Sequence, residues 1–159
     1  MRKILWAVLA VIVMAACSGE REYIQYRGHS MGMSAKAMVD SLLAEVENLA
    51  VDTNKSGENN IVLVDTMMRN FSITVYQQND TISDILENYV ASYNDSTSNL
   101  WQRMHDDLEK EFGWPDMKHQ GDLHKEAIYD NKKGTVVLIL LNTYSPTLSV
   151  RYSTMTAEK

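Results

Sequence analysis

The sequence predicts an α+β domain, an antiparallel sheet of about six strands with three helices on one face. Several short segments alternate apolar with polar residues, which is the period of a half-buried strand. Three longer segments repeat apolar residues at the three- and four-residue spacing of an amphipathic helix. The elements follow in the order β-α-β-β and then α-α-β-β-β, which suggests two related halves, although no clear internal sequence repeat is visible.

The first half opens with a strand at residues 23–27, which Gly28 ends. Ser34 is a typical N-cap residue. A helix over 35–50 follows it, because apolar residues recur at helical spacing at Met38, Val39, Leu42, Leu43, Val46 and Leu49.

A polar loop at 52–60 separates this helix from two strands. The β-branched run 61–64 and the alternating segment 71–76 predict an antiparallel pair. A second helix is expected over 82–93, on the spacing of Ile82, Ile85, Leu86, Tyr89, Val90 and Tyr93.

Residues 94–98 break that helix, and a third one follows with a single apolar stripe. Gly113 and Pro115 are placed to end it. The polar stretch 116–123 is expected to be a loop or a poor turn of helix. The stripe of the third helix consists of Leu100, Trp101, Met104, Leu108 and Phe112.

The C-terminal third predicts a meander: a strand at 126–130, a turn at 131–134, a strand at 135–143 and a last strand at 148–153. The segment Val136 to Leu141 is apolar at every position. A strand that is apolar on both faces should be central in its sheet and covered by helices.

The first seventeen residues resemble a bacterial lipoprotein signal. Two basic residues precede an apolar run that is too short to span a bilayer and that ends in small residues before Cys17, the only cysteine. The resemblance implies that Cys17 is lipidated and that the chain is cut before it. The expected organisation is a signal peptide (1–16), a tether (17–21), a single domain (22–153) and a frayed tail (154–159).

The mature chain would hold 143 residues with 13 basic against 21 acidic side chains, a formal charge of −8. An acidic surface does not suit nucleic acid. It also repels anionic membrane surfaces, so that attachment would rest on the lipid. Ser18 stands where many lipoproteins kept in the inner membrane have Asp, and this favours the outer membrane.

Two stretches resemble a family of small secreted or lipid-anchored proteins of the Bacteroidetes without an assigned activity. One is Tyr26-Arg27-Gly28 followed by the Ser34-capped helix. The other is the helix that ends in Leu108-Glu-Lys-Glu-Phe-Gly-Trp-Pro115, similar to the family's Leu-x-x-Lys-Tyr-Gly-x-Pro pattern. The resemblance implies a helix-on-sheet fold in two halves and no particular chemistry.

Candidate chemistry centres on the histidines. His119 and His124 could hold a metal if their loop folds back, with Asp116 and Asp122 nearby. His105, on the third helix, is a candidate general base. His29 stands beside Met31 and Met33, residue types that suit copper. In each case the alternative is an ordinary solvated or core-filling role.

The sequence contains no phosphate-binding loop, nucleophile elbow or metalloprotease motif, which favours a binding module over an enzyme. Trp114 and the pair Met67-Met68 are candidate contact residues. For Trp114 the alternative is that the ring folds back onto the core beside Phe112. The leading hypothesis is a non-enzymatic, lipid-anchored cell-envelope module, without a cofactor, that binds a protein or a glycan. The alternative is a small envelope hydrolase or metal-binding protein that uses His105 or the pair His119 and His124.

Overall fold

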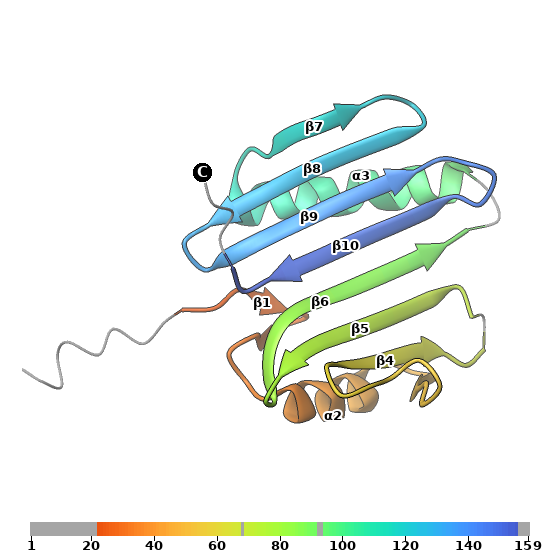
Figure 1. The fold of residues 1–159 in the computed structure, drawn as a ribbon. Coiled ribbons are helices and arrows are strands. Elements are labelled where there is room, and N and C mark those ends of the chain that lie inside the picture. Colours follow the sequence, from red (N-terminus) through yellow and green to blue (C-terminus); the bar gives the residue numbers. More distant parts are fainter. Residues whose placement is uncertain (1–21, 68, 92–93, 156–159) are drawn as a thin grey trace, which may run out of the picture.

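The computed structural model describes residues 22–67, 69–91 and 94–155, so the signal, the tether with Cys17, and Met68 lie outside the described residues. The chain forms an eight-stranded antiparallel sheet in the order β3-β4-β5-β6-β10-β9-β8-β7, together with a separate two-stranded hairpin, β1-β2. Figure 1 shows both described helices behind the large sheet.

The elements have the following bounds: β1 (Gln25–Tyr26), β2 (His29–Ser30), α2 (Ala35–Glu45), β3 (Leu49–Val51), β4 (Asn60–Asp65), β5 (Phe71–Gln78), β6 (Thr81–Val90), α3 (Asn94–Phe112), β7 (Asp116–Gln120), β8 (His124–Asn131), β9 (Gly134–Leu141) and β10 (Thr147–Ser153). Among the described residues, no helix combines the length and the apolar character that a membrane span requires.

The predicted fold class is wrong, because the described chain is mostly β. Two helices and ten strands replace the expected three and six. Each half consists of one helix followed by four strands, α2 with β3–β6 and α3 with β7–β10. The halves meet where their last strands, β6 and β10, pair. This arrangement differs from the predicted halves, which had the orders β-α-β-β and α-α-β-β-β.

The expected helix over 82–93 is strand β6 up to Val90, and a β-bulge explains the error. Tyr76 pairs with Asp84 and Gln77 with Ile82, so Ser83 is an extra residue without a partner across the ladder. The extra residue places Ile82 and Ile85, three positions apart, on the same face of the sheet, where both are buried. A bulged strand can therefore show buried apolar residues three positions apart, which is the spacing expected of a helix.

The first helix is confirmed but shorter than predicted. The Ser34 hydroxyl accepts a hydrogen bond from the Ala37 amide at 3.1 Å, as an N-cap should. The helix ends at Glu45, and Asn48, with φ of +61°, turns the chain into the edge strand β3. The predicted final turn of the helix is therefore a turn and a strand.

The third predicted helix, α3, is confirmed, and it begins earlier, within the expected break at 94–98. Gly113 ends it with φ of +88°, and its amide donates to the Glu109 carbonyl at 2.9 Å. The polar stretch that follows is neither the predicted loop nor a turn of helix, because it contains strand β7. As an edge strand β7 needs no apolar face, since polar residues at an edge discourage pairing with other chains.

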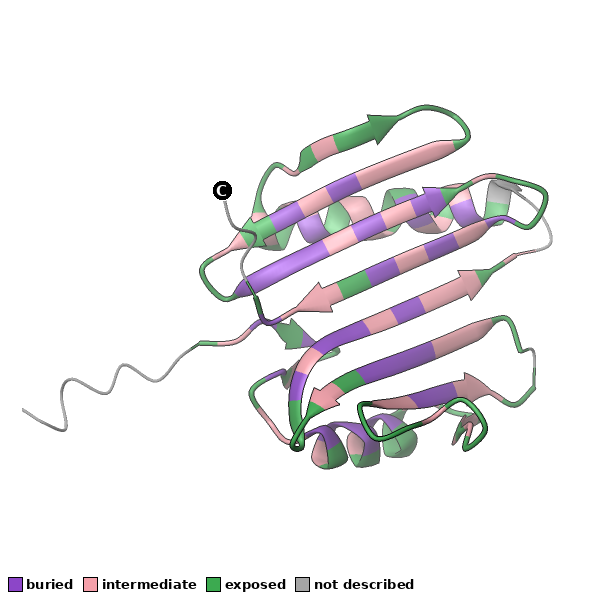
Figure 2. Cartoon of the chain, in the orientation of Figure 1, coloured by how far each residue is buried: buried purple, intermediate pink, exposed green. Residues whose placement is uncertain are grey.

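Strand β9 is interior to the sheet, as predicted, but helices cover only one of its faces. Val136, Leu138 and Leu140 are fully buried and face α3. Val137 and Ile139 point to the opposite face, which no described helix covers (Figure 2). The prediction that helices cover this strand therefore holds for one face only.

Candidate functional site

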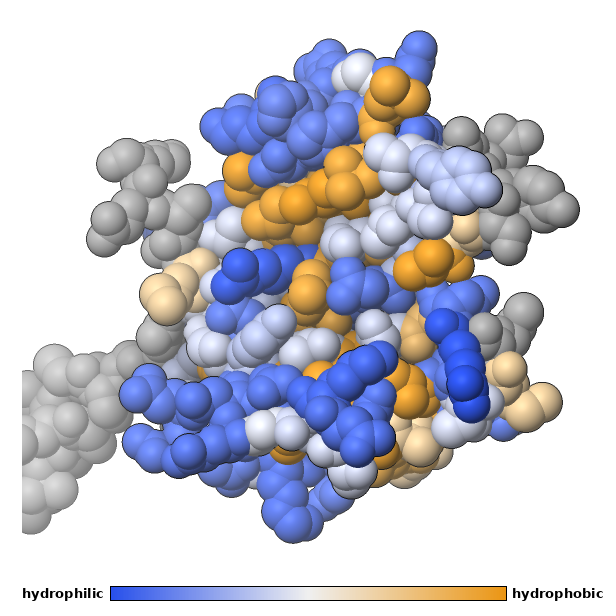
Figure 3. Space-filling view, turned by 45° about the vertical axis from the view of Figure 1, so that its right-hand side comes forward, coloured by the Kyte–Doolittle hydropathy of each residue, from blue (hydrophilic) through white to orange (hydrophobic). Residues whose placement is uncertain are grey.

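The most unusual surface of the molecule is the sheet face opposite α2 and α3, which we call the open face. Antiparallel sheets commonly present polar side chains on a face without helices. Here apolar side chains gather over β8 and β9, as Figure 3 shows. We call this group the apolar patch; it consists of Ile128, Val137, Ile139 and Leu141.

The register of the strands places the patch within a continuous surface. Val137 lies opposite Ile128 on β8, and Ile139 lies opposite Ser149 on β10. The residues of the patch are half-buried by one another, except for Leu141, which is 39% exposed. Contiguous exposed apolar surface of this kind marks interaction sites in soluble proteins.

A polar band crosses the open face where the two halves meet. Arg151 on β10 donates to the Asp84 carboxylate on β6 at 2.9 Å, and Asp84 is almost fully buried. The Ser149 hydroxyl donates to the Asn88 side chain at 2.7 Å. These contacts separate the apolar patch from the other half of the open face.

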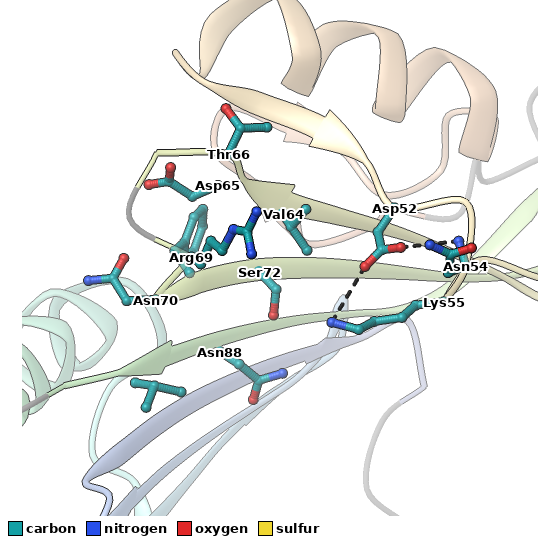
Figure 4. A pocket seen from close by; sticks show the side chains of 12 residues that line it. Asp52, Asn54, Lys55, Val64, Asp65, Thr66, Arg69, Asn70, Ser72 and Asn88 are labelled. Atoms are coloured by element: carbon teal, nitrogen blue, oxygen red, sulfur yellow. Dashed lines mark hydrogen bonds and ion pairs between the residues drawn. The ribbon is translucent and has the colours of Figure 1, made fainter.

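The other half of the open face contains a pocket of about 590 Å³ (Figure 4). Ser72 and Asn88 rise from β5 and β6 at its floor, while Lys55 and Arg69 approach from two loops. Lys55 is paired with Asp52 at 3.4 Å. The pocket is lined by hydroxyl, amide and cationic groups, so it suits a polar ligand better than an apolar one.

The two predicted metal ligands lie close together, although in strands and not in a loop. His119 is on β7 and His124 is on β8, with ring centroids 4.2 Å apart. Glu126, which was not among the predicted ligands, joins them: its Oε2 lies 3.9 Å from His119 Nε2 and 3.8 Å from His124 Nε2. Asp116 and Asp122 do not belong to this cluster. An i, i+2 His-x-Glu pattern in a strand was the signal that could have identified the third residue.

His105 has a packing role in the structure. Its ring stacks on Trp101 with centroids 4.7 Å apart, and its Nδ1 is hydrogen-bonded to the Tyr129 hydroxyl. Burial raises the pKa of Tyr129, as do the charges of Glu109 and Asp106, so Tyr129 stays protonated. His105 does not line the pocket on the open face.

The suggested copper residues do not converge. His29 pairs with Glu45 at 3.0 Å, while Met31 is fully buried in the core. Met33 packs against the core from a half-buried position. Because the Met31 side chain belongs to the core, the structure favours the core-filling role over a copper loop.

A buried carboxylate that no sequence motif indicates joins the hairpin β1-β2 to the sheet. Glu87 on β6 accepts hydrogen bonds from the Tyr26 hydroxyl at 2.6 Å, from Arg27 at 2.8 Å and from the Tyr89 hydroxyl at 2.9 Å. Burial raises the pKa of Tyr26, as does the Glu87 charge, so that the hydroxyl remains a donor. The network is structural, since both carboxylate oxygens of the buried Glu87 accept hydrogen bonds from neighbouring side chains.

The tryptophans and methionines occupy distinct environments. Trp101 is in the core at 4% exposure, whereas Trp114 is 89% exposed in the turn before β7. Met67 is 74% exposed. Trp114 is therefore not folded back on the core beside Phe112, which was the alternative to an exposed contact residue.

Comparisons with known proteins do not identify this chain. It matches no protein-family model, and neither the curated proteins nor the solved structures give a match. The resemblance to Bacteroidetes lipoproteins therefore stays a prediction.

Proposed function

We propose that this protein is a lipid-anchored module of the cell envelope that binds another protein through its open face. The observation that carries the proposal is strand β9, which is apolar on both faces although α3 covers only one of them. The second apolar face contributes nothing to the core of the described chain. Its composition is explained if a partner covers it.

The chemistry of the patch favours a protein over a glycan. Its four residues are aliphatic and carry neither hydrogen-bonding groups nor aromatic rings. A flat aliphatic surface beside the polar band around Arg151 matches the layout of protein interfaces, in which an apolar centre is bordered by polar groups. The anchor on Cys17 would keep this surface close to a membrane, because residues 18–21 reach only about 13 Å when extended.

Site-specific photo-cross-linking in the native envelope tests the proposal. A photoactivatable residue replaces Ile139 in one variant and Gln102, exposed on α3, in the control. We expect a discrete adduct from position 139 and none from position 102. The adduct should disappear when Val137→Asp is added, since that change places a charge within the patch.

Other outcomes would contradict the proposal. Equal adducts from both positions would mean that the open face has no special role. An adduct of twice the mass of the chain would show that the partner is a second copy of this protein. Adducts with lipid alone would replace the protein partner by the membrane surface.

A further inference from the structure

We propose that His119, His124 and Glu126 form a zinc-binding site at the β7–β8 edge of the open face. The three side chains come from neighbouring strands and point to the same side of the sheet. His119 lies opposite Glu126 across the ladder, and His124 precedes Glu126 by two positions on β8. The zinc site uses other residues and a different ligand than the protein partner, although Glu126 lies opposite Ile139 and His124 lies opposite Leu141 of the apolar patch.

The donor atoms are already close to the spacing that zinc requires. Zinc–nitrogen and zinc–oxygen bonds of about 2.0–2.2 Å in a tetrahedron place neighbouring donors about 3.4 Å apart. The two histidine–glutamate distances are 3.9 and 3.8 Å, and one donor atom from each residue lies within 4.8 Å of the others. About half an ångström remains to be closed in the two histidine–glutamate distances. The two imidazole rings are stacked with their planes 25° apart, so rotation of the exposed side chains must also turn one nitrogen of each ring towards the same metal.

The backbone that carries these ligands is held in place. Asn142 binds the turn between β7 and β8 twice, because its side-chain amide donates to the Asp122 carbonyl at 3.0 Å and its backbone amide donates to the Leu123 carbonyl at 2.9 Å. The same side chain donates to the Ser98 hydroxyl on α3 at 3.2 Å. The turn that positions His124 is thus fixed to the rest of the domain, and little ordering is needed when a metal binds.

The local charges suit a cation. Lys125 lies between His124 and Glu126 in the sequence, but its ammonium is on the other face of the sheet, 4.9 Å from the centre of the Trp101 ring. The alternation of the strand therefore places the carboxylate on the histidine side and the lysine on the opposite side. A metal between the imidazoles would be balanced by the Glu126 charge.

The donor set selects the class of metal. Two imidazoles and a carboxylate are typical ligands of zinc, whereas magnesium and calcium prefer oxygen alone and Cu(I) prefers sulfur. Three protein ligands leave a fourth position. The side chains of His119, His124 and Glu126 are 56%, 38% and 24% exposed, so solvent can reach that position. The site is therefore of the open kind, in which water completes the coordination.

Isothermal titration with zinc chloride tests the proposal on protein that carries Cys17→Ser, so that no thiol competes for the metal. We expect one zinc ion per chain. The affinity should fall about tenfold or more in His124→Ala and in Glu126→Gln. The control is His29→Ala, which removes a histidine that also pairs with a glutamate, at 3.0 Å from Glu45, but lies elsewhere. This variant should bind zinc like the parent.

The absorption spectrum of the cobalt-substituted parent protein gives a second measurement, which requires no ligand variant. We expect the intense visible bands of four-coordinate cobalt, and zinc should abolish them. The proposal is overturned by a weak six-coordinate spectrum or by the lack of saturable zinc binding. It is also overturned if binding survives His124→Ala unchanged, or if His29→Ala lowers the affinity as much as the ligand variants do.

Discussion

Leu138 and Ile139 are adjacent in β9 but face opposite sides of the sheet, so truncating each of them separates folding from binding. Leu138 is fully buried under α3, and Leu138→Ala should cost about 3 kcal/mol of unfolding free energy. Ile139 is half-buried on the open face, and Ile139→Ala should cost about 1 kcal/mol. The unfolding free energy of a whole domain is about 5–15 kcal/mol, so the Leu138→Asp variant, which also buries a charge, should not fold.

Urea unfolding, followed by the fluorescence of the buried Trp101, measures both free energies. The Ile139→Asp variant should remain folded and lose the cross-links formed from a probe at position 137. Equal destabilisation by Leu138→Ala and Ile139→Ala would refute the assignment of the two faces. If Ile139→Ala were the more destabilising, the open face would be covered within the monomer.

Four further predictions follow from individual residues. Trp114→Ala should change stability by less than about 0.5 kcal/mol, because the ring is 89% exposed, and calorimetry would show a larger loss if the ring were packed. Glu87→Gln should cost about 2 kcal/mol in urea unfolding, since three hydrogen-bond donors lose a charged acceptor. Because burial raises the pKa of Tyr26, the folded state keeps a proton that the unfolded state loses near pH 10. Stability should therefore fall as the pH rises above about 10, and less steeply in Tyr26→Phe; a flat pH profile would contradict this. Cys17→Ser should move the protein out of the detergent phase on phase separation, and retention there would exclude lipidation.

The sequence predicted an element correctly where a few residues close together in the chain decide its structure. Local signals correctly predicted the Ser34 cap, the apolar stripe of α3 and the glycine that ends this helix. They also predicted the closing strands β9 and β10. The prediction failed at β6 because hydrophobic spacing does not distinguish a helix from a strand that carries a bulge at Ser83. That bulge is stabilised from a distant position, since both the amide and the hydroxyl of Thr154 donate to the Ser83 carbonyl.

The candidate site was only partly predictable for a related reason. His119 and His124 were singled out by residue type, but Glu126 joins them only through the cross-strand register of β7 and β8. The sequence shows that β9 is apolar on two faces, but the arrangement of the described helices on one face of the sheet follows only from the three-dimensional structure. The carboxylate of Glu87 was hidden because its partners Tyr26 and Arg27 are about 60 residues away.

The central position of β10 determines when the sheet can be completed. This strand is the last of the described chain, yet it lies between β6 and β9, and its Arg151 pairs with Asp84 67 residues earlier. Strands β3–β6 and β7–β9 can form from local hairpins as the chain emerges, but the two halves can join only after residue 153 is available. Until then β6 and β9 both present free edges, and a chain arrested at that stage would be open to pairing with other strands.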